Sequence, residues 1–203
     1  MGKAIAELVV ILTWRPSLLE GKSINLRIAE KEDIPLLQQW FNDVRFAGDY
    51  ANFPLQTSRN ELEPQIVEHK LYGHEWVNFI VEKKDGTKIG EAVHYISAPN
   101  FGWVEIGYTI ITEHRNRGYG TEAVQVLTDY LFLTKNIPRI QAVVDTENVA
   151  SKSVLEKNGF KKEGTLRKAL WNAAGRWADG YLYSILREEW KEPKILTRTT
   201  SET

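Results

Sequence analysis

The chain has 203 residues, with 26 lysines and arginines against 27 aspartates and glutamates and a formal net charge of −1 at pH 7. This balance excludes a global electrostatic basis for nucleic-acid binding, and we expect no nucleic-acid partner. The length suits one domain with a substantial core, while the absence of cysteine excludes disulfides and thiolate metal sites.

The N-terminal residues contain a short apolar run, residues 8–12, of the kind found in signal peptides. Residues 4–6 are also apolar, but Glu7 separates them from residues 8–12, and no small-residue cleavage site follows. The run is also far shorter than the roughly 20 apolar residues that span a bilayer. We therefore interpret residues 1–21 as an N-terminal arm or extra strand, expect no membrane association, and place the protein in the cytoplasm.

The next segment predicts a strand followed by two helices. Residues 24–29 alternate like a strand, and Asp33 is placed to cap the helix that follows. Ser58 and Glu61 form a capping box for a second helix, which contains Pro64. Polar side chains thus mark where each helix begins.

The remaining strands are predicted from apolar and alternating runs. They cover residues 76–82, 87–96, 103–111, 139–145, 160–163 and 181–187. Asp85 and Gly86 are a strong hairpin signal between the first two of these strands. The pattern predicts a sheet of many short strands.

Helices separate the later strands, and a tail follows them. Apolar residues recur at helical spacing over residues 123–131, and Asn148 caps a short helix that ends at Asn158 and Gly159. Residues 22–190 form the predicted domain. The polar residues 191–203 are predicted to be a disordered tail.

The most informative segment, residues 113–122, joins a predicted strand to a predicted helix. Gly118 and Gly120 permit a tight turn with consecutive exposed N–H groups, and the helix presents its partly positive N-terminus there. Arg115 and Arg117 add positive charge. This junction predicts a phosphate-binding loop.

The two glycines also fit other kinds of loop. A dinucleotide fold requires G-x-G-x-x-G, and a P-loop requires G-x-x-x-x-G-K-[ST]; neither is present. The two glycines alone leave an ordinary Gly-rich turn open. The full spacing Arg115-x-x-Gly118-x-Gly120, after a strand ending at Ile110-Ile111, resembles the pyrophosphate-binding signature of the GNAT N-acetyltransferases.

Three more segments carry the same resemblance in the order typical of the family. Residues 148–160 resemble its "N-x-x-S … N-G-F" segment, residues 26–33 its opening, and residues 105–108 its fourth strand. Together they cover roughly residues 22–190. The similarity is to the branch that contains the ribosomal-protein N-terminal acetyltransferases.

The resemblance implies an α+β fold in three layers. A mixed, mostly antiparallel twisted sheet would be flanked by helices and splayed at the acyl-CoA site, in a monomer or homodimer. Acetyl-CoA would be the acyl donor, and no metal is implied. The implied CoA-binding residues are Ile110, Ile111, Thr112, Arg115, Asn116, Arg117, Gly118, Tyr119, Gly120, Thr121 and Asn148.

The absence of cysteine excludes an acetyl-thioenzyme, so direct attack by an amine in a ternary complex is expected. The attacking amine must be neutral. An α-amine with a pKa near 7.8 is roughly 14% neutral at pH 7, against roughly 0.04% for a lysine-type amine. An α-amine therefore needs less help from the enzyme.

Two residues are candidates for catalysis. Glu105 lies on the motif strand and is predicted to act as a base through water, although a solvent-exposed or arginine-paired carboxylate is an equal alternative. Ser151 resembles the serine proposed as the acid in this branch, and it can equally be part of the helix cap. Asp179 and Tyr183 are fallback polar groups.

Two positions depart from the family pattern. Leu155 stands where many members place a tyrosine that protonates the thiolate, and Leu170 stands where the branch has a glutamate. These departures leave a non-catalytic acyl-CoA-binding module open as an alternative. Asn148 is the family's pantetheine-side asparagine, and it can serve as a plain helix cap as well.

The acceptor is expected to be a peptide or protein N-terminal α-amine, with a small amine such as a polyamine, aminoglycoside or amino acid derivative as the alternative. Phe46, Tyr50, Phe53 and Trp103 are predicted to line its entrance, against the alternative of simple packing. The four histidines are scattered and predict no metal site.

Overall fold

The computed structural model describes residues 18–50, 57–71, 74–96, 100 and 102–195. Residues 1–17 of the predicted arm, Phe53, and residues 196–203 of the predicted tail lie outside the described residues.

A single sheet forms the middle layer, in the order β1-β2-β4-β5-β6-β7-β9-β8, with β3 on the edge of β4. Every neighbouring pair is antiparallel except β6 and β7. The strands are β1 Leu18–Glu20, β2 Ile24–Ile28, β3 Lys70–Leu71, β4 His74–Lys83, β5 Lys88–Tyr95, β6 Trp103–Ile110, β7 Arg139–Asp145, β8 Lys161–Trp171 and β9 Trp177–Leu186. The predicted mixed, mostly antiparallel sheet is confirmed.

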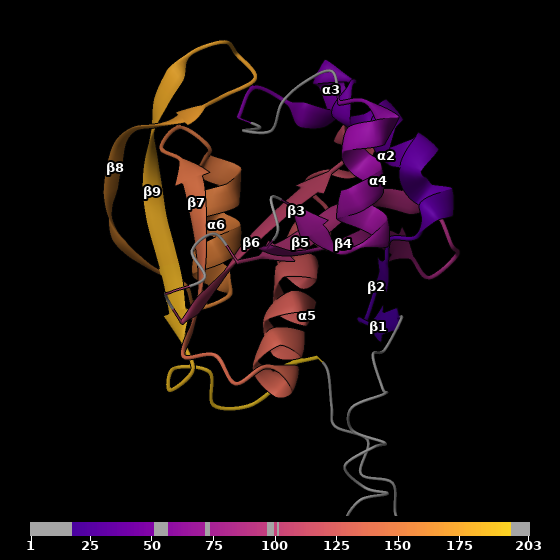
Figure 1. The fold of residues 1–203 in the computed structure, drawn as a ribbon. Helices are drawn as coiled ribbons and strands as arrows, with labels where there is room; N and C mark the ends of the chain where they lie inside the picture. Colours follow the sequence, from indigo (N-terminus) through magenta and orange to yellow (C-terminus); the bar gives the residue numbers. More distant parts are fainter. Residues whose placement is uncertain (1–17, 51–56, 72–73, 97–99, 101, 196–203) are drawn as a thin grey trace, which may run out of the picture.

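Helices cover both faces of the sheet and complete three layers (Figure 1). Helices α2, α3 and α4 lie above the central strands, and α5 lies below them with α6 beside it. The α-helices are α2 Ile34–Phe41, α3 Val44–Ala47, α4 Arg59–Val67, α5 Tyr119–Thr134 and α6 Val149–Lys157, with 3₁₀ turns η1 Lys31–Asp33 and η2 Thr112–His114.

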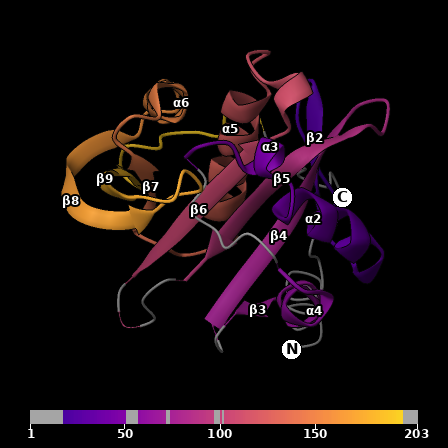
Figure 2. The same ribbon diagram turned by 90° about the horizontal axis from the view of Figure 1, so that it is seen from above.

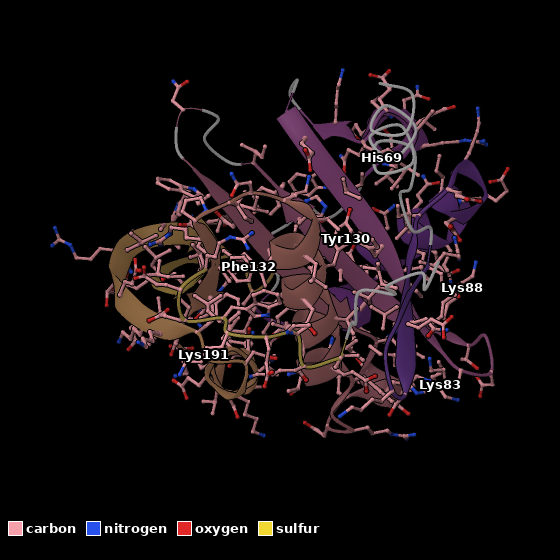
Figure 3. The ribbon with its side chains drawn as sticks, turned by 90° about the horizontal axis from the view of Figure 1, so that it is seen from below. His69, Lys83, Lys88, Tyr130, Phe132 and Lys191 are labelled. Carbon is pink, nitrogen blue, oxygen red and sulfur yellow. The ribbon has the colours of Figure 1, made fainter. Side chains whose placement is uncertain are left out.

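The core has one cluster on each face of the sheet. Along β4, Phe79 and Val81 pack toward α5, whereas Ile80 joins the cluster of α2, α3 and α4, as the two-residue period of a strand requires. Below the sheet lies Tyr130 of α5 (Figure 3). Its ring meets Phe79 edge-on at 5.8 Å. The central strands are therefore buried on both sides.

The sheet opens between its two parallel strands. The β6–β7 register consists of three pairs, from Trp103 with Arg139 to Glu105 with Gln141. Both strands continue well beyond this point, to Ile110 and Asp145, with no further pairing between them. Seen from above, the β7–β9 part curls away from the straight strands β4, β5 and β6 (Figure 2). The predicted splay is confirmed.

The helix caps agree with the sequence at two of three positions. Ser58 Oγ accepts the Glu61 N–H at 3.3 Å, and Asn148 Oδ1 accepts the Ser151 N–H at 3.0 Å. Asp33 is the N-cap residue of α2, as predicted, but the capping hydrogen bond is absent because its side chain makes no such bond to the helix. Instead it accepts hydrogen bonds from Arg27 at 2.8 and 3.0 Å, which draw the carboxylate toward β2.

The last two strands are longer than predicted. Residues 160–163 and 181–187 were expected, whereas β8 and β9 contain 11 and 10 residues. Most β8 side chains are exposed, so the strand has no apolar alternation that a sequence pattern can detect. Long antiparallel pairing with β9 holds it in place.

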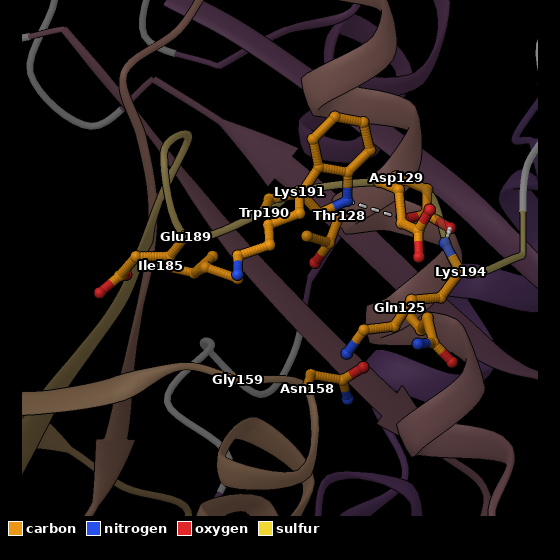
Figure 4. A pocket seen from close by; sticks show the side chains of 11 residues that line it. Gln125, Thr128, Asp129, Asn158, Gly159, Ile185, Glu189, Trp190, Lys191 and Lys194 are labelled. Carbon is orange, nitrogen blue, oxygen red and sulfur yellow. Dashed lines mark hydrogen bonds between the residues drawn. The ribbon is translucent and has the colours of Figure 1, made fainter.

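The C-terminal segment is fixed to α5 by one buried carboxylate. Asp129 accepts the Trp190 Nε1–H at 2.9 Å and the backbone N–H groups of Lys194 and Ile195 at 3.0 and 2.8 Å. These contacts border a small pocket of about 260 Å³ between α5 and the chain after β9 (Figure 4). Residues 191–195 of the predicted tail thus pack on the domain.

Candidate active site

A groove of about 1340 Å³ runs from the loop before α5 to helix α4, across the opening between β6 and β7. Pockets that hold one small ligand typically measure about 300–1,000 Å³, so this groove has room for two substrates. We call the part formed by residues 114–121, β7 and α6 the loop end. The part formed by residues 48–50, α4, β4 and β5 is the helix end.

The loop end is built around the first turn of α5. Gly118 is its N-cap, with a left-handed φ of 85°, and no side chain caps the helix. The first N–H groups of α5 therefore carry no capping side chain, which is the arrangement that binds phosphate. Asn116, Gly118, Tyr119, Gly120 and Thr121, all among the predicted CoA-binding residues, line the groove here.

The two arginines of the loop differ in their placement. Arg115 lines the groove, but its Nε donates to the Ile110 carbonyl and a terminal nitrogen donates to the Phe46 carbonyl, both at 2.8 Å. It thereby ties the end of β6 to α3. Arg117 is exposed and does not line the groove.

Only one of the three predicted residues at the end of β6 reaches the groove. Ile110 lines it. The Ile111 N–H donates to the Ile89 carbonyl at 2.9 Å, and Thr112 Oγ1 donates to the Arg45 carbonyl at 2.8 Å. Both residues are directed to neighbouring elements instead of the groove.

A pair of hydroxyl groups lies beside the opening of the sheet. The Tyr108 hydroxyl is 2.9 Å from Ser151 Oγ, and both residues line the groove. Burial raises the pKa of Tyr108 to about 12, although the Ser151 hydrogen bond lowers it in part. Leu155, one turn along α6, is buried where the family's tyrosine was expected.

Glu105 lies in a polar network beneath the opening and does not line the groove. Its Oε1 accepts the Tyr95 hydroxyl at 2.7 Å, and its Oε2 accepts Gln141 Nε2 at 3.1 Å. Burial, and then the Glu105 carboxylate, raise the pKa of Tyr95 well above its usual range. Tyr95 itself lines the groove, so Glu105 reaches it only through this phenol.

A different carboxylate lines the groove. Glu91 on β5 is 6% exposed, and Asn78 Nδ2 donates to its Oε2 at 3.3 Å. Burial raises the pKa of Glu91 to about 7, against a smaller lowering by Asn78. The motifs in the sequence do not identify this residue. Its one signal was a carboxylate among the small and apolar residues of a central strand.

The aromatic residues of the helix end differ from the predicted set. Tyr50 is exposed and lines the groove. Phe46 is buried and stacks on Trp40 at 5.1 Å, and Trp103 lies under the Arg139 guanidinium at 5.8 Å; neither lines the groove.

Two other aromatic residues occupy the helix end. Trp76 and Tyr95 are directly opposite one another on β4 and β5 and stack at 4.5 Å, and both line the groove. They form the wall that was expected from Phe46 and Trp103.

The fallback groups serve structural contacts. Asp179 accepts the Lys168 N–H, and Tyr183 donates to Glu156, both at 2.8 Å. Leu170 is buried and lines the groove. Within the described residues there is no group of three or more histidines and carboxylates suited to a metal. No helix in this part of the chain is long and apolar enough to cross a membrane.

Comparison with known proteins gives a consistent result. The family model described as "Acetyltransferase (GNAT) domain" matches residues 23–161. An uncharacterized N-acetyltransferase, p20, from Bacillus licheniformis is 33% identical over 175 residues, covering 85% of this chain and 97% of that protein.

Solved structures share the fold. The spermidine N-acetyltransferase of Vibrio cholerae, in complex with CoA and spermine, has a TM-score of 0.73 at 24% identity and covers 83% of this chain and 98% of its own. The ribosomal-protein-S5-alanine acetyltransferase of Vibrio fischeri has a TM-score of 0.71 at 24% identity, covering 86% and 98%.

Proposed function

The chain belongs to the GNAT acetyltransferase family and is an N-acetyltransferase, and from that premise we propose that its acceptor is the α-amine of a peptide or protein N-terminus. The observation that carries this proposal is the chemistry of the helix end. Asn60 and Gln65 on α4 and Tyr50 line it with neutral hydrogen-bonding groups, which match the amides of a peptide.

The loop end suits the donor, acetyl-CoA. The uncapped first turn of α5 and the glycines at 118 and 120 would hold its pyrophosphate, and Arg115 adds a positive charge at the wall. The thioester supplies the activated acetyl group. The chain's own task is to orient the amine, remove its proton and protonate the leaving sulfur.

Ser151 is our candidate for protonating the sulfur, with the Tyr108 hydroxyl as its partner at 2.9 Å. Asn148 orients it by capping α6 at the Ser151 N–H. The role of Glu105 as a base through water stays a prediction. Its carboxylate accepts hydrogen bonds from Tyr95 and Gln141 and does not line the groove, so its contact with the groove runs through Tyr95.

A small cationic amine is the second candidate acceptor. Asp49, Glu61 and Glu91 line the helix end, against Lys70 from the neighbouring β3 and the Arg115 guanidinium beside Gly48. This acidic balance favours a polyamine over a neutral ligand. The Vibrio cholerae relative is named for such an acceptor.

The two acceptors are distinguished by the products. We expect mass spectrometry of a peptide with a free N-terminus and an internal lysine to show acetylation of the α-amine, also with spermidine in competition. Acetylation confined to the lysine or to spermidine would overturn the proposal.

Gly120→Glu, which adds bulk and negative charge at the first turn of α5, should abolish acetyl-CoA binding in calorimetry.

A further inference from the structure

We propose that Glu91 and Asn78 form the subsite for the reacting ammonium group of the acceptor and that Glu91 takes the proton from it. The inference rests on the acetyltransferase function above. It assigns the proton acceptor to a carboxylate on β5, outside every segment that carries the family resemblance.

The sheet register puts both side chains on the floor of the helix end. Asn78 is opposite Val93, and Glu91 is opposite Ile80 on β4 and Thr109 on β6. Asn78 and Glu91 are therefore diagonal neighbours on the face covered by α2 and α4. Both line the groove and both are more than nine-tenths buried, at 3% and 6% exposed.

The hydrogen-bonding capacity of this pair is unfilled. Asn78 Oδ1 is buried and has no hydrogen-bond partner among the described residues. No salt bridge joins Glu91 to a lysine, arginine or histidine of the described chain. Buried acceptors without donors are costly, and an ammonium offers three N–H groups to the two of them.

The surroundings do not supply another base at this point. The titratable groups lining the helix end and the adjacent strand are Asp49, Tyr50, Glu61, Lys70, Tyr95 and Tyr108. Two more lie next to them: Glu105 on β6, behind Tyr95, and the Arg115 guanidinium beside Gly48. Glu61 accepts the Ser58 N–H and hydroxyl at the start of α4, and Tyr95 donates to Glu105. Of the lining carboxylates, only Glu91 projects from the central strands beside Thr109.

The position of Glu91 also separates the two proton transfers. Because Thr109 and Tyr108 are consecutive on β6, Glu91 and the Tyr108–Ser151 pair lie on opposite faces of that strand. One ammonium proton passes to Glu91, and the nitrogen lone pair then forms the C–N bond as the C–S bond breaks. Ser151 Oγ–H protonates the thiolate sulfur, and the second nitrogen proton passes through the Tyr108 hydroxyl to restore Ser151. Glu91 then releases its proton to solvent, so the net products are the amide, the thiol and one proton.

The test compares Glu91→Gln with a control, Glu82→Gln. Glu82 is on β4, lies outside the groove, and its carboxylate accepts a hydrogen bond from Arg27 on β2. Acetylation of tetra-alanine amide and of spermidine is followed across pH 5.5–9.5. Wild type should show a rise in kcat/KM centred near pH 7. Glu91→Gln should lose this rise together with about 10²-fold in kcat/KM, while Glu82→Gln keeps the wild-type profile.

A second measurement needs no turnover. In the complex with CoA, binding of either amine should force Glu91 to ionise and release protons near pH 7, measurable by calorimetry in buffers of different ionisation enthalpy. Glu91→Gln should bind more weakly and release none. Equal proton release by both proteins, or no binding of either amine, would overturn the subsite. Binding with Glu91-dependent release but no acetylation would instead overturn the proposed acceptor.

Discussion

The hydroxyl of Tyr108 on β6 and the hydroxyl of Ser151 on α6 lie 2.9 Å apart, across the opening where the two parallel strands diverge. This contact joins the "Glu-Ile-Gly-Tyr" motif to the "N-x-x-S" motif, which are separated by more than forty positions in the chain. The two motifs therefore meet at one place in the fold, the groove.

If these hydroxyls act as one proton-donating unit, the losses in kcat from removing each of them should not add. Ser151→Ala should lower kcat by about 10²-fold with little change in the KM for acetyl-CoA, and Tyr108→Phe should lower it less. The double variant should be no slower than Ser151→Ala alone. Steady-state kinetics of the three proteins test this, and fully additive losses would show that the two hydroxyls act independently.

Gly118 and Gly86 offer a matched pair for the donor loop. Both have a left-handed φ, 85° and 83°, and a Cβ at either would meet no atom within 4 Å. Alanine at either position should cost about 1 kcal/mol of stability through backbone strain. Only Gly118→Ala should weaken acetyl-CoA binding, because Gly86 is in the β4–β5 turn. Equal affinities by calorimetry would remove Gly118 from the binding loop.

Stability should depend on pH through Glu91. Burial raises the pKa of Glu91 to about 7 from an ordinary value of 4.5, so the folded protein binds more protons between these values. The contribution of Glu91 to the free energy of unfolding is therefore fully present below about pH 4.5. It is lost as pH rises through 7, and its size is on the order of 3 kcal/mol. Relative to wild type, Glu91→Gln should therefore be more stable at pH 8 than at pH 5. If urea denaturation gave the same difference in unfolding free energy between the two proteins at every pH, Glu91 would not be a buried group that ionises near pH 7.

Asp33 should act in the opposite direction. Burial alone would raise its pKa, but hydrogen bonds from Arg27, the Glu30 N–H and Lys88 outweigh burial and hold the pKa well below its usual range. Its stabilisation is present above the unfolded pKa, near 4, and is lost as pH falls further. Asp33→Asn should destabilise by about 3 kcal/mol at pH 7. The difference from wild type in urea should shrink at pH 2.5; a constant difference would mean that charge is unimportant.

Asp129 should be required to hold the C-terminal segment on α5. Asp129→Asn weakens an acceptor of three hydrogen bonds and should cost about 2 kcal/mol. Limited proteolysis followed by mass spectrometry should show faster cleavage after Trp190. Glu192→Gln, an exposed carboxylate at the same pocket, is the control and should behave as wild type.

The parts of the fold that local chemistry determines were predictable. The hairpin turn at Asp85-Gly86 and the caps at Ser58 and Asn148 rest on neighbouring residues, so their patterns identify them. The length of β8 was not predictable. Its exposed side chains show no periodicity, and its pairing depends on β9.

The site divides in the same way. The loop at 115–121 is contiguous, so its glycines identify it. Glu91 and Asn78 are 13 positions apart and meet only through the β4–β5 register. The hydrogen bonds of Arg115, which lines the groove, to the carbonyls of Ile110 and Phe46 likewise depend on the fold. A charged residue within a strand sequence points to a site only when its side chain is known to be buried, and the sequence does not show which face of β5 is covered.

Pairing between β6 and β7 stops at Glu105 and Gln141, and this affects how much folded protein is present, not how fast it catalyses. Beyond Glu105 and Gln141, the backbone edges of both strands lack each other as partners, so a donor bound between them would complete the middle of the sheet. Binding to the folded state alone stabilises it by mass action. We therefore expect the folded fraction, and with it resistance to degradation, to follow the supply of acetyl-CoA: a cell short of acetyl groups would keep less of this enzyme.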